Sequence, residues 1–431
     1  MQALLSFESA PPLAAPLRFF VTAPLFATLA GLLLMVGGGD VLASRWAPAA
    51  LAATHLITVG FMLQVMIGAL IQILPVVAGA NLSRPLAVAR GVHAGLSAGG
   101  LVLAASFLMP SLAGFMLAAT LLGGTSLVFV LATGRALRGV PSTSPTIRGI
   151  KLALAGLAVV VLLGVILSSA LARGWSIDLP LLADLHAGWG FGAWAGGLLV
   201  AMAYVVVPMF QLTPPYPLRW SWWFPVVLIA SLLLWTLAVL LGAPWLIRLA
   251  QGLLALAGTA FALYTLRLQG QRRRARSDAT FHYWRGGLAS TVAAMVMLLV
   301  AAVRPGFADL PTWPLLFGIL LGVGGFMSMI NGMIYKIVPF LAWLHLQNAG
   351  QGRVPAPNVN KLLPEKRAQG QMRAHFIACS CLAAAVVWPD LLAAPAGAAF
   401  ALANGWLAFN LFGTLKLYGG HLALISGRTK A

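Results

Sequence analysis

The chain alternates between long apolar runs and short breaks that contain charged residues, glycine or proline. A helix needs roughly 20 mainly apolar residues to cross the hydrocarbon core of a bilayer. Windows of that size predict twelve membrane-spanning helices. The weakest predicted boundary is the break around Gly242–Pro244, which separates the seventh helix from the eighth. The predicted helices start near residues 16, 47, 86, 111, 146, 180, 218, 244, 283, 312, 372 and 395.

One pattern recurs in the second, sixth and tenth of these predicted helices. Its copies run through glycines and aromatic residues to Pro75, Pro208 and Pro339, which stand 133 and 131 residues apart in a chain of 431. Regular self-similarity indicates a repeated architecture. We therefore expect a single transmembrane domain over residues 1–431, built from three four-helix units that each carry the pattern on the second helix. The units are predicted at approximately residues 16–140, 141–270 and 271–420.

Composition supports a membrane location for these helices. Apolar residues make up 61% of the chain, charged residues 8%, and the mean hydropathy is +0.94. A water-soluble protein of this length has too few charges here to cover its surface. The predicted fold class is an all-α polytopic membrane protein, in which membrane lipids are the surrounding partner.

Basic residues are distributed unevenly between the two sides of the predicted helices. Of the 27 lysines and arginines, 22 fall on the side that carries both termini, which predicts cytoplasmic termini by the positive-inside rule. The net charge of +19 therefore reflects loops near anionic lipid, such as the one with Arg272–Arg276, and we expect no nucleic-acid partner. The turns of the opposite side hold Arg45, Arg173, Arg248 and Arg304.

Two histidines stand near the outer ends of the second and sixth helices, at matching depth in two copies of the pattern. His55 and His186 are the predicted cofactor-binding and metal-binding residues, because an imidazole inside a span is costly and ligates metals or haem iron well. The structural alternative is a pair of histidines that hydrogen-bond between helices. The third copy has no histidine, and Phe317 to Ile319 occupy the corresponding position.

The remaining histidines are predicted to be interfacial side chains beside basic loops: His93, His282, His345, His375 and His421. His375 and Cys379 are four residues apart and share a helix face, so a soft-metal site is an alternative to simple packing. Six polar residues on the repeat helices suggest a polar path toward the cytoplasm, or else interhelical hydrogen bonds. They are Gln64, Gln72, Tyr204, Asn331, Tyr335 and Lys336.

Short motifs in this sequence resemble those of a known family. An opening Pro16-Leu-Arg-Phe-Phe20, the stretch His55 to Gly60, and the series His186, Ala187, Gly190, Tyr204, Val207 and Pro208 are similar to NnrS-type bacterial membrane proteins. The twelve-helix, three-unit plan resembles the catalytic subunit of haem–copper oxidases. These resemblances imply haem b, copper as an alternative metal, a location in the bacterial cytoplasmic (inner) membrane, and redox chemistry or nitric oxide tolerance.

The same resemblance implies that His55 matches the span-two haem ligand of the oxidases and His186 the span-six copper ligand. The oxidases also need histidine pairs in spans seven and ten, where this chain has none. A complete oxygen or nitric oxide reductase site is therefore not expected, no catalytic residue is assigned, and enzymatic activity stays undecided. A redox partner and a diatomic gas ligand are the implied partners. The alternative function is a permease for a small solute or metal ion, and a third is a purely structural role.

Overall fold

The computed structural model describes residues 10–274, 276–351 and 354–428. Twelve helices in this part of the chain are long and apolar enough to cross a membrane, as the sequence predicts. Their successive bounds are Ala14–Leu42, Pro48–Ala78, Pro85–Leu108, Leu112–Ala136, Pro145–Arg173, Leu179–Gln211, Leu218–Leu240, Pro244–Gly270, Ala279–Val303, Trp313–Gly350, Glu365–Val387 and Pro389–Ile425. All other described elements are short helices, and no strand is among them.

Three of the twelve spans are interrupted by π-helix. The second span consists of α2 (Pro48–His55), a π segment (Leu56–Leu63) and α3 (Gln64–Ala78). The sixth consists of α7 (Leu179–Gly188), a π segment (Trp189–Gly196) and α8 (Gly197–Gln211). The tenth consists of α12 (Trp313–Gly318), a π segment (Ile319–Met327) and α13 (Ser328–Gly350). Such segments are rare, mostly one turn long, and frequent at functional sites.

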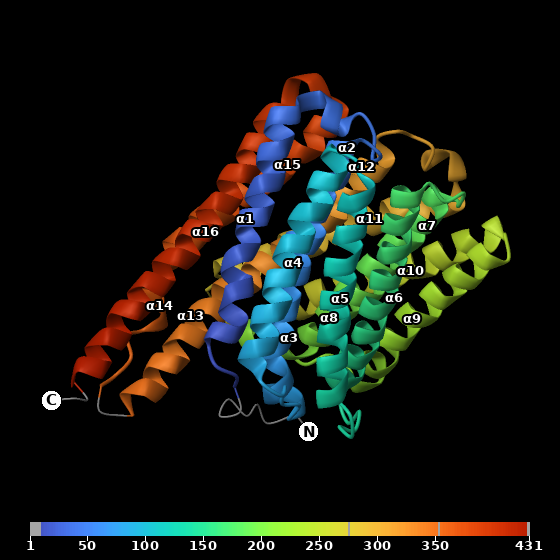
Figure 1. Cartoon of the computed structure of the whole chain (residues 1–431). Coiled ribbons are helices and arrows are strands. Elements are labelled where there is room, and N and C mark those ends of the chain that lie inside the picture. The colour runs from blue at the N-terminus through green and yellow to red at the C-terminus, as the bar shows by residue number, and fades with distance from the viewer. Residues whose placement is uncertain (1–9, 275, 352–353, 429–431) are drawn as a thin grey trace.

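The other spans surround these three. They are α1 (Ala14–Gly37), α4 (Pro85–Leu108), α5 (Leu112–Ala136), α6 (Pro145–Arg173), α9 (Leu218–Leu240), α10 (Pro244–Gly270), α11 (Ala279–Val303), α15 (Glu365–Val387) and α16 (Pro389–Arg428). The start of α1 and the end of α16 lie at the same end of the bundle (Figure 1), here called the terminal end. α2, α7 and α12 begin at the opposite end, here called the far end (Figure 1).

The first and last spans pack with their backbones in contact (Figure 1). A Cβ added to Gly31 would lie 2.5 Å from the backbone nitrogen of Ala401, and one added to Gly397 would lie 2.3 Å from that of Met35. Small residues allow such close approach between membrane helices, where packing rather than the hydrophobic effect drives association. These glycines therefore allow the first and last spans to pack directly against each other.

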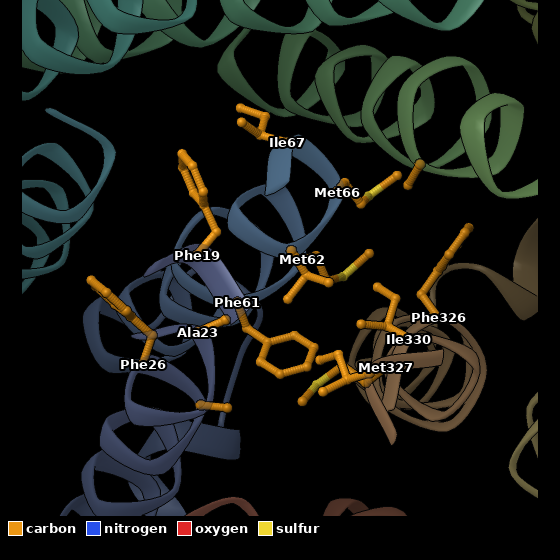
Figure 2. Close-up of a cluster of buried hydrophobic side chains, with 14 of the residues drawn as sticks. Phe19, Ala23, Phe26, Phe61, Met62, Met66, Ile67, Phe326, Met327 and Ile330 are labelled. Atoms are coloured by element: carbon orange, nitrogen blue, oxygen red, sulfur yellow. The ribbon is translucent and has the colours of Figure 1, made fainter. Parts of the chain in front are cut away.

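The second and tenth spans meet in the buried core. Phe61 and Met62 lie beside Met327 and Ile330 (Figure 2), and all four side chains are less than 9% exposed. Phe19 and Phe26 of α1 cover the other side of the second span (Figure 2). The outer faces of the bundle instead expose large apolar side chains, among them Leu233, Leu256, Leu402 and Phe409. This pattern fits a chain that has lipid as its solvent.

Two predicted boundaries are wrong. The helices expected to start near residues 372 and 395 begin at Glu365 and Pro389. The first turns of α15 carry Lys366, Arg367 and Gln369, so an apolar window begins only after them. The predicted break around Gly242–Pro244 is confirmed, because α9 ends at Leu240 and α10 starts at Pro244.

Candidate functional site

A cavity of about 1290 Å³ lies between the second, sixth and tenth spans. It exceeds the roughly 300–1,000 Å³ of most small-molecule pockets. Its lining extends to the far-end loops through Ser44 and Asp309, so the cavity reaches the far end of the bundle. All three π segments contribute to its wall, through Val59, Met62, Gly190, Trp194, Gly322 and Phe326 among others.

His55 and His186 both line this cavity. Nδ1 of His55 lies 2.8 Å from the carbonyl oxygen of Leu51, one turn earlier on the same helix. Nδ1 of His186 lies 3.0 Å from the carbonyl oxygen of Val160 on α6. A carbonyl can only accept, so each Nδ1 carries the proton and each Nε2 keeps a free lone pair. Within the described residues neither Nε2 has a hydrogen-bond partner.

The two imidazoles line one and the same cavity. Each ring is also held from one side. The ring of His55 packs 5.2 Å from that of Phe107 on α4. A Cβ added to Gly164 of α6 would lie 3.1 Å from Cε1 of His186, so only glycine leaves that ring undisturbed. The sequence pattern thus predicted two histidines at one level, and the structure brings them to one cavity.

The third repeat helix contributes no imidazole to this cavity. Phe317, Gly318 and Ile319 line it at the position where the sequence predicts the counterpart of the two histidines. Trp313 stacks on Phe317 with ring centroids 5.0 Å apart. This wall is therefore flat and aromatic, and it offers surface to a ligand but no metal-binding atom.

Three tryptophans that line the cavity have buried indole N–H groups without a partner in the described part of the chain. They are Trp194, Trp235 and Trp313. An unpaired buried donor costs about 1–3 kcal/mol, so such groups call for a specific reason. Their nitrogen atoms expose almost no surface, however, so a ligand in the cavity would not reach them and they do not indicate its chemistry.

Charged side chains are found where the cavity reaches the far end. Arg45, in the loop before α2, forms an ion pair with Asp184 of α7, and the two side chains are 32% and 41% exposed. The guanidinium of Arg45 also lies 4.5 Å from the ring centre of Trp46. Arg248 and Asp309 line the same region. These contacts tie the start of the second span to the start of the sixth, next to both histidines.

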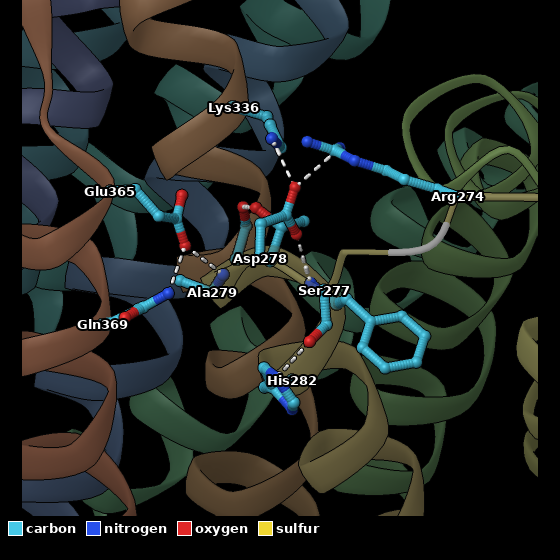
Figure 3. A network of polar contacts seen from close by, with 11 residues as sticks. Arg274, Ser277, Asp278, Ala279, His282, Lys336, Glu365 and Gln369 are labelled. Carbon is cyan, nitrogen blue, oxygen red and sulfur yellow. Dashed lines mark hydrogen bonds and ion pairs between the residues drawn. The ribbon is translucent and has the colours of Figure 1, made fainter. Parts of the chain in front are cut away.

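The six polar residues of the predicted path do not form one continuous seam. Gln64 donates to Ser97 of α4, while Tyr204 packs against Tyr216, and no hydrogen bond in the described residues joins either to the tenth span. Gln72 is buried elsewhere on α3. Lys336 forms an ion pair of 2.7 Å with Asp278 at the start of α11 (Figure 3). Asn331 instead lies 3.5 Å from Nδ1 of His375, and Tyr335 accepts from Asn410.

His375 was predicted to be interfacial, and that prediction is wrong. Its side chain is fully buried on α15, where Ser328 and Cys379 contact its Nε2 atom. Among the described residues, no group of three or more His, Cys, Asp or Glu side chains is placed to hold a metal ion. Neither His375 with Cys379 nor His55 with His186 therefore completes a site made of protein ligands alone.

Sequence comparison adds no relatives to this picture. No protein-family model matches the chain, and no curated protein sequence matches it at a significant level. The geometry of the cavity and its two imidazoles is therefore the basis for inferring function.

Proposed function

We propose that this chain is a haem-binding membrane protein concerned with redox chemistry or nitric oxide handling, and that His55 and His186 are its iron ligands. One observation carries the proposal. Each of the two cavity imidazoles donates its Nδ1 proton to a backbone carbonyl and presents an unpaired Nε2. Ligating histidines in metalloproteins are oriented in this way, with the second nitrogen bonded to a carbonyl or carboxylate.

The number of protein ligands favours haem over a bare copper ion. A porphyrin supplies four nitrogen ligands itself, so one or two histidines complete the iron. A copper site made by protein side chains needs a third ligand in most geometries, and the described residues bring no third His, Cys, Asp or Glu to these two histidines. The cavity volume and the aromatic residues in its wall also suit a large flat ligand.

Each part of the chain has a separate task in this proposal. His55 and His186 would hold the iron, while the carbonyls of Leu51 and Val160 keep each Nδ1 protonated. Bound haem would supply an iron that changes oxidation state or takes up a diatomic gas. Ligation by both histidines favours electron transfer or sensing, and ligation by one leaves a position open for nitric oxide.

The three π segments support a threefold repeat of the kind found in haem–copper oxidases. They occur on the second, sixth and tenth spans, which carry the repeated sequence pattern. The first starts directly after His55, the second three residues after His186, and the third at Ile319, within the aligned position. In our proposal the repeat brings three wide helix segments around one cavity, and two of the three retain an imidazole.

The proposed location is a bacterial cytoplasmic membrane with the terminal end inside. The first span begins and the last ends on one side (Figure 1), and most of the basic residues fall on that side in the predicted topology. The positive-inside rule assigns such a side to the cytoplasm. The cavity and its histidines would then lie toward the periplasm.

A permease is the less favoured function. Solute transport would suit the large cavity, but the charged residues that we would assign to coupling are already paired. Asp184 is bound to Arg45 and Lys336 to Asp278. Solute uptake that depends on Asp184 or Lys336 would favour transport over haem binding.

The test is the absorption spectrum of protein purified from haem-supplied cells. We expect a Soret band in the wild type, with loss of haem in His55→Ala and in His186→Ala. His93→Ala and His345→Ala are matched controls, because their imidazoles bond instead to Thr22 and Tyr418. Full haem content in both cavity variants would remove the ligand assignment.

A further inference from the structure

Two neighbouring spans, α6 and α9, carry arginine and tryptophan where they begin. The span formed by α7 and α8 starts at the far end (Figure 1), so α6 before it and α9 after it both begin at the terminal end. Arg148 lies on the first turn of α6, and Arg219 and Trp222–Trp223 lie on the first turns of α9. The two helices are in contact, and a Cβ added to Gly149 would lie 3.7 Å from Cγ of Pro225. None of the four charged and aromatic side chains lines the large cavity.

Arg148 crosses from α6 to both tryptophans of α9. Cζ of its guanidinium lies over the ring of Trp222, 4.8 Å from the ring centre, and 5.3 Å from the ring centre of Trp223. Such a cation–π contact leaves the five N–H donors of arginine available to an acceptor. Among the described residues, Arg148 takes part in no ion pair and donates no side-chain hydrogen bond. The aromatic pair therefore holds this cation in place without using its donors.

Two further cations border the tryptophan pair. Arg219 precedes the two tryptophans by three and four positions on α9, a spacing that places all three side chains on one helix face. Lys151 follows Arg148 by three positions on α6, and its amine donates to the carbonyl of Val140. Neither α6 nor α9 has an acidic residue in its first turn. In the described part of the chain, no carboxylate forms an ion pair with any of these three cations.

Helix stability does not account for this group of cations. A positive charge at the start of a helix opposes the helix dipole. Arg148 lies in the first turn of α6, directly after the cap formed by Ser144, and Arg219 is the second residue of α9. Like charges on one surface also repel each other. An anion bound between α6 and α9 would compensate both effects.

The surroundings of the cations indicate which anion fits. Trp223 is 56% exposed, and Val227, one turn further into the span, is 46% exposed. Leu233 continues this exposed apolar side of α9. In a bilayer such a surface contacts acyl chains, and tryptophan is enriched at the level of the headgroups. A soluble anion would pair only with the arginines, whereas a phospholipid would also cover the apolar side chains below them.

We propose that this surface binds an anionic phospholipid, with its phosphate on Arg148 and Arg219 and an acyl chain along Trp223 and Val227. A guanidinium donates two parallel N–H bonds to phosphate oxygens in favourable cases. The topology proposed above puts the terminal end in the cytoplasm, where the membrane leaflet carries the negative surface potential of anionic lipids. The bound lipid would hold the start of α6 against the start of α9. Haem binding is not required for this site.

The test is native mass spectrometry of the purified full-length chain in detergent, with phosphatidylglycerol or phosphatidylcholine of equal chain length added. We expect tighter binding of phosphatidylglycerol, and binding at least about fivefold weaker in Arg148→Gln. Trp223→Leu stays apolar but removes one ring from the guanidinium, so it should also weaken binding and remains informative if the arginine variant does not fold. Both variants should melt like the wild type without lipid.

Arg90→Gln is the matched control and should bind phosphatidylglycerol like the wild type. Arg90 is an exposed arginine in the second turn of α4, at the same end of the bundle, and no described aromatic ring lies against its guanidinium. A loss in this variant equal to that in Arg148→Gln would show a general effect of charge and overturn the site.

Three other results would also overturn the proposal. The first is equal affinity of the wild type for the two lipids, and the second is unchanged phosphatidylglycerol binding in the folded Arg148→Gln and Trp223→Leu variants. The third is displacement of phosphatidylglycerol by a soluble competitor. Displacement by inorganic phosphate would assign the arginines to a free anion, and displacement by polyglutamate would assign the surface to an acidic protein.

Discussion

Gly164, which packs against the ring of His186, allows a direct test of the ligand geometry. Gly164 lies in the interior of α6, and the Cβ of an alanine there would stand 3.1 Å from Cε1 and 3.7 Å from Nδ1 of His186. The ring would have to move by a few tenths of an ångström, away from the position in which it donates to Val160. Gly164→Ala therefore perturbs the imidazole without removing it.

The expected effects on binding and stability have opposite signs. A hydrogen bond of this kind contributes about 0.5–1.5 kcal/mol, and loss of a group that orients a ligating histidine typically lowers metal affinity about 10–100-fold. Alanine in a helix interior is about 0.8–1.0 kcal/mol more favourable than glycine. Gly164→Ala should thus lower haem affinity at least about tenfold while the apoprotein melts no lower than the wild type.

Haem titration into the purified apoprotein, with a thermal melt of the same sample, measures both quantities. Gly124→Ala is the matched control, because this interior glycine of α5 has no atom within 4 Å of an added Cβ. It should keep wild-type affinity. An affinity of Gly164→Ala equal to that of the control would refute the assignment of His186 as an oriented ligand.

Other predictions concern the stability of the bundle. Asp278→Asn retains the cap on α11 but loses the charge that pairs with Lys336, and should cost about 1.5–3 kcal/mol at neutral pH. Burial acts to raise the pKa of Asp278, but the hydrogen bond and charge of Lys336 outweigh it and hold that pKa below its ordinary value. The stabilisation is therefore complete above about pH 4 and is lost as the pH falls through the lower folded-state pKa, so melts of wild type and variant should converge in acid. Gly31→Ala and Gly397→Ala would drive a methyl group into backbone atoms and should each destabilise by about 1–3 kcal/mol in denaturation assays. Gly405→Ala is the control on α16, because an added Cβ there meets no atom within 4 Å, and it should melt like the wild type. A lower melting temperature for this control would show that any added methyl group disturbs the helix and would contradict the explanation by close backbone packing.

The sequence predicts the spans well because the requirement for an apolar run is local. Ten of the twelve predicted starts fall within four residues of the observed ones. Of the two late starts, one belongs to α15, whose first turns are polar, and the other to α16, which begins with Pro389 and Asp390 and has Pro395 inside it. The late predicted start of α15 produced the mistaken placement of His375. Because α15 begins at Glu365, this residue lies about three turns inside the helix and not at its end.

The site was only partly predictable. Equal depth in two copies of a pattern was enough to pair His55 with His186, since repeated helices place corresponding residues at one level. The π segments have no distinctive sequence signal beyond their glycines, which also occur in ordinary helix contacts. The partners of Gln64 and Asn331 depend on which helices become neighbours, and a single sequence does not contain that information.

Haem content per chain is the most direct test of the central claim, and a pyridine haemochromogen assay on the purified wild-type protein measures it. We predict b-type haem at about one per chain, as expected for one iron and two imidazoles, and almost none when His55 and His186 are both replaced by alanine. Protein that is folded, made with ample haem, and still free of it would contradict the account.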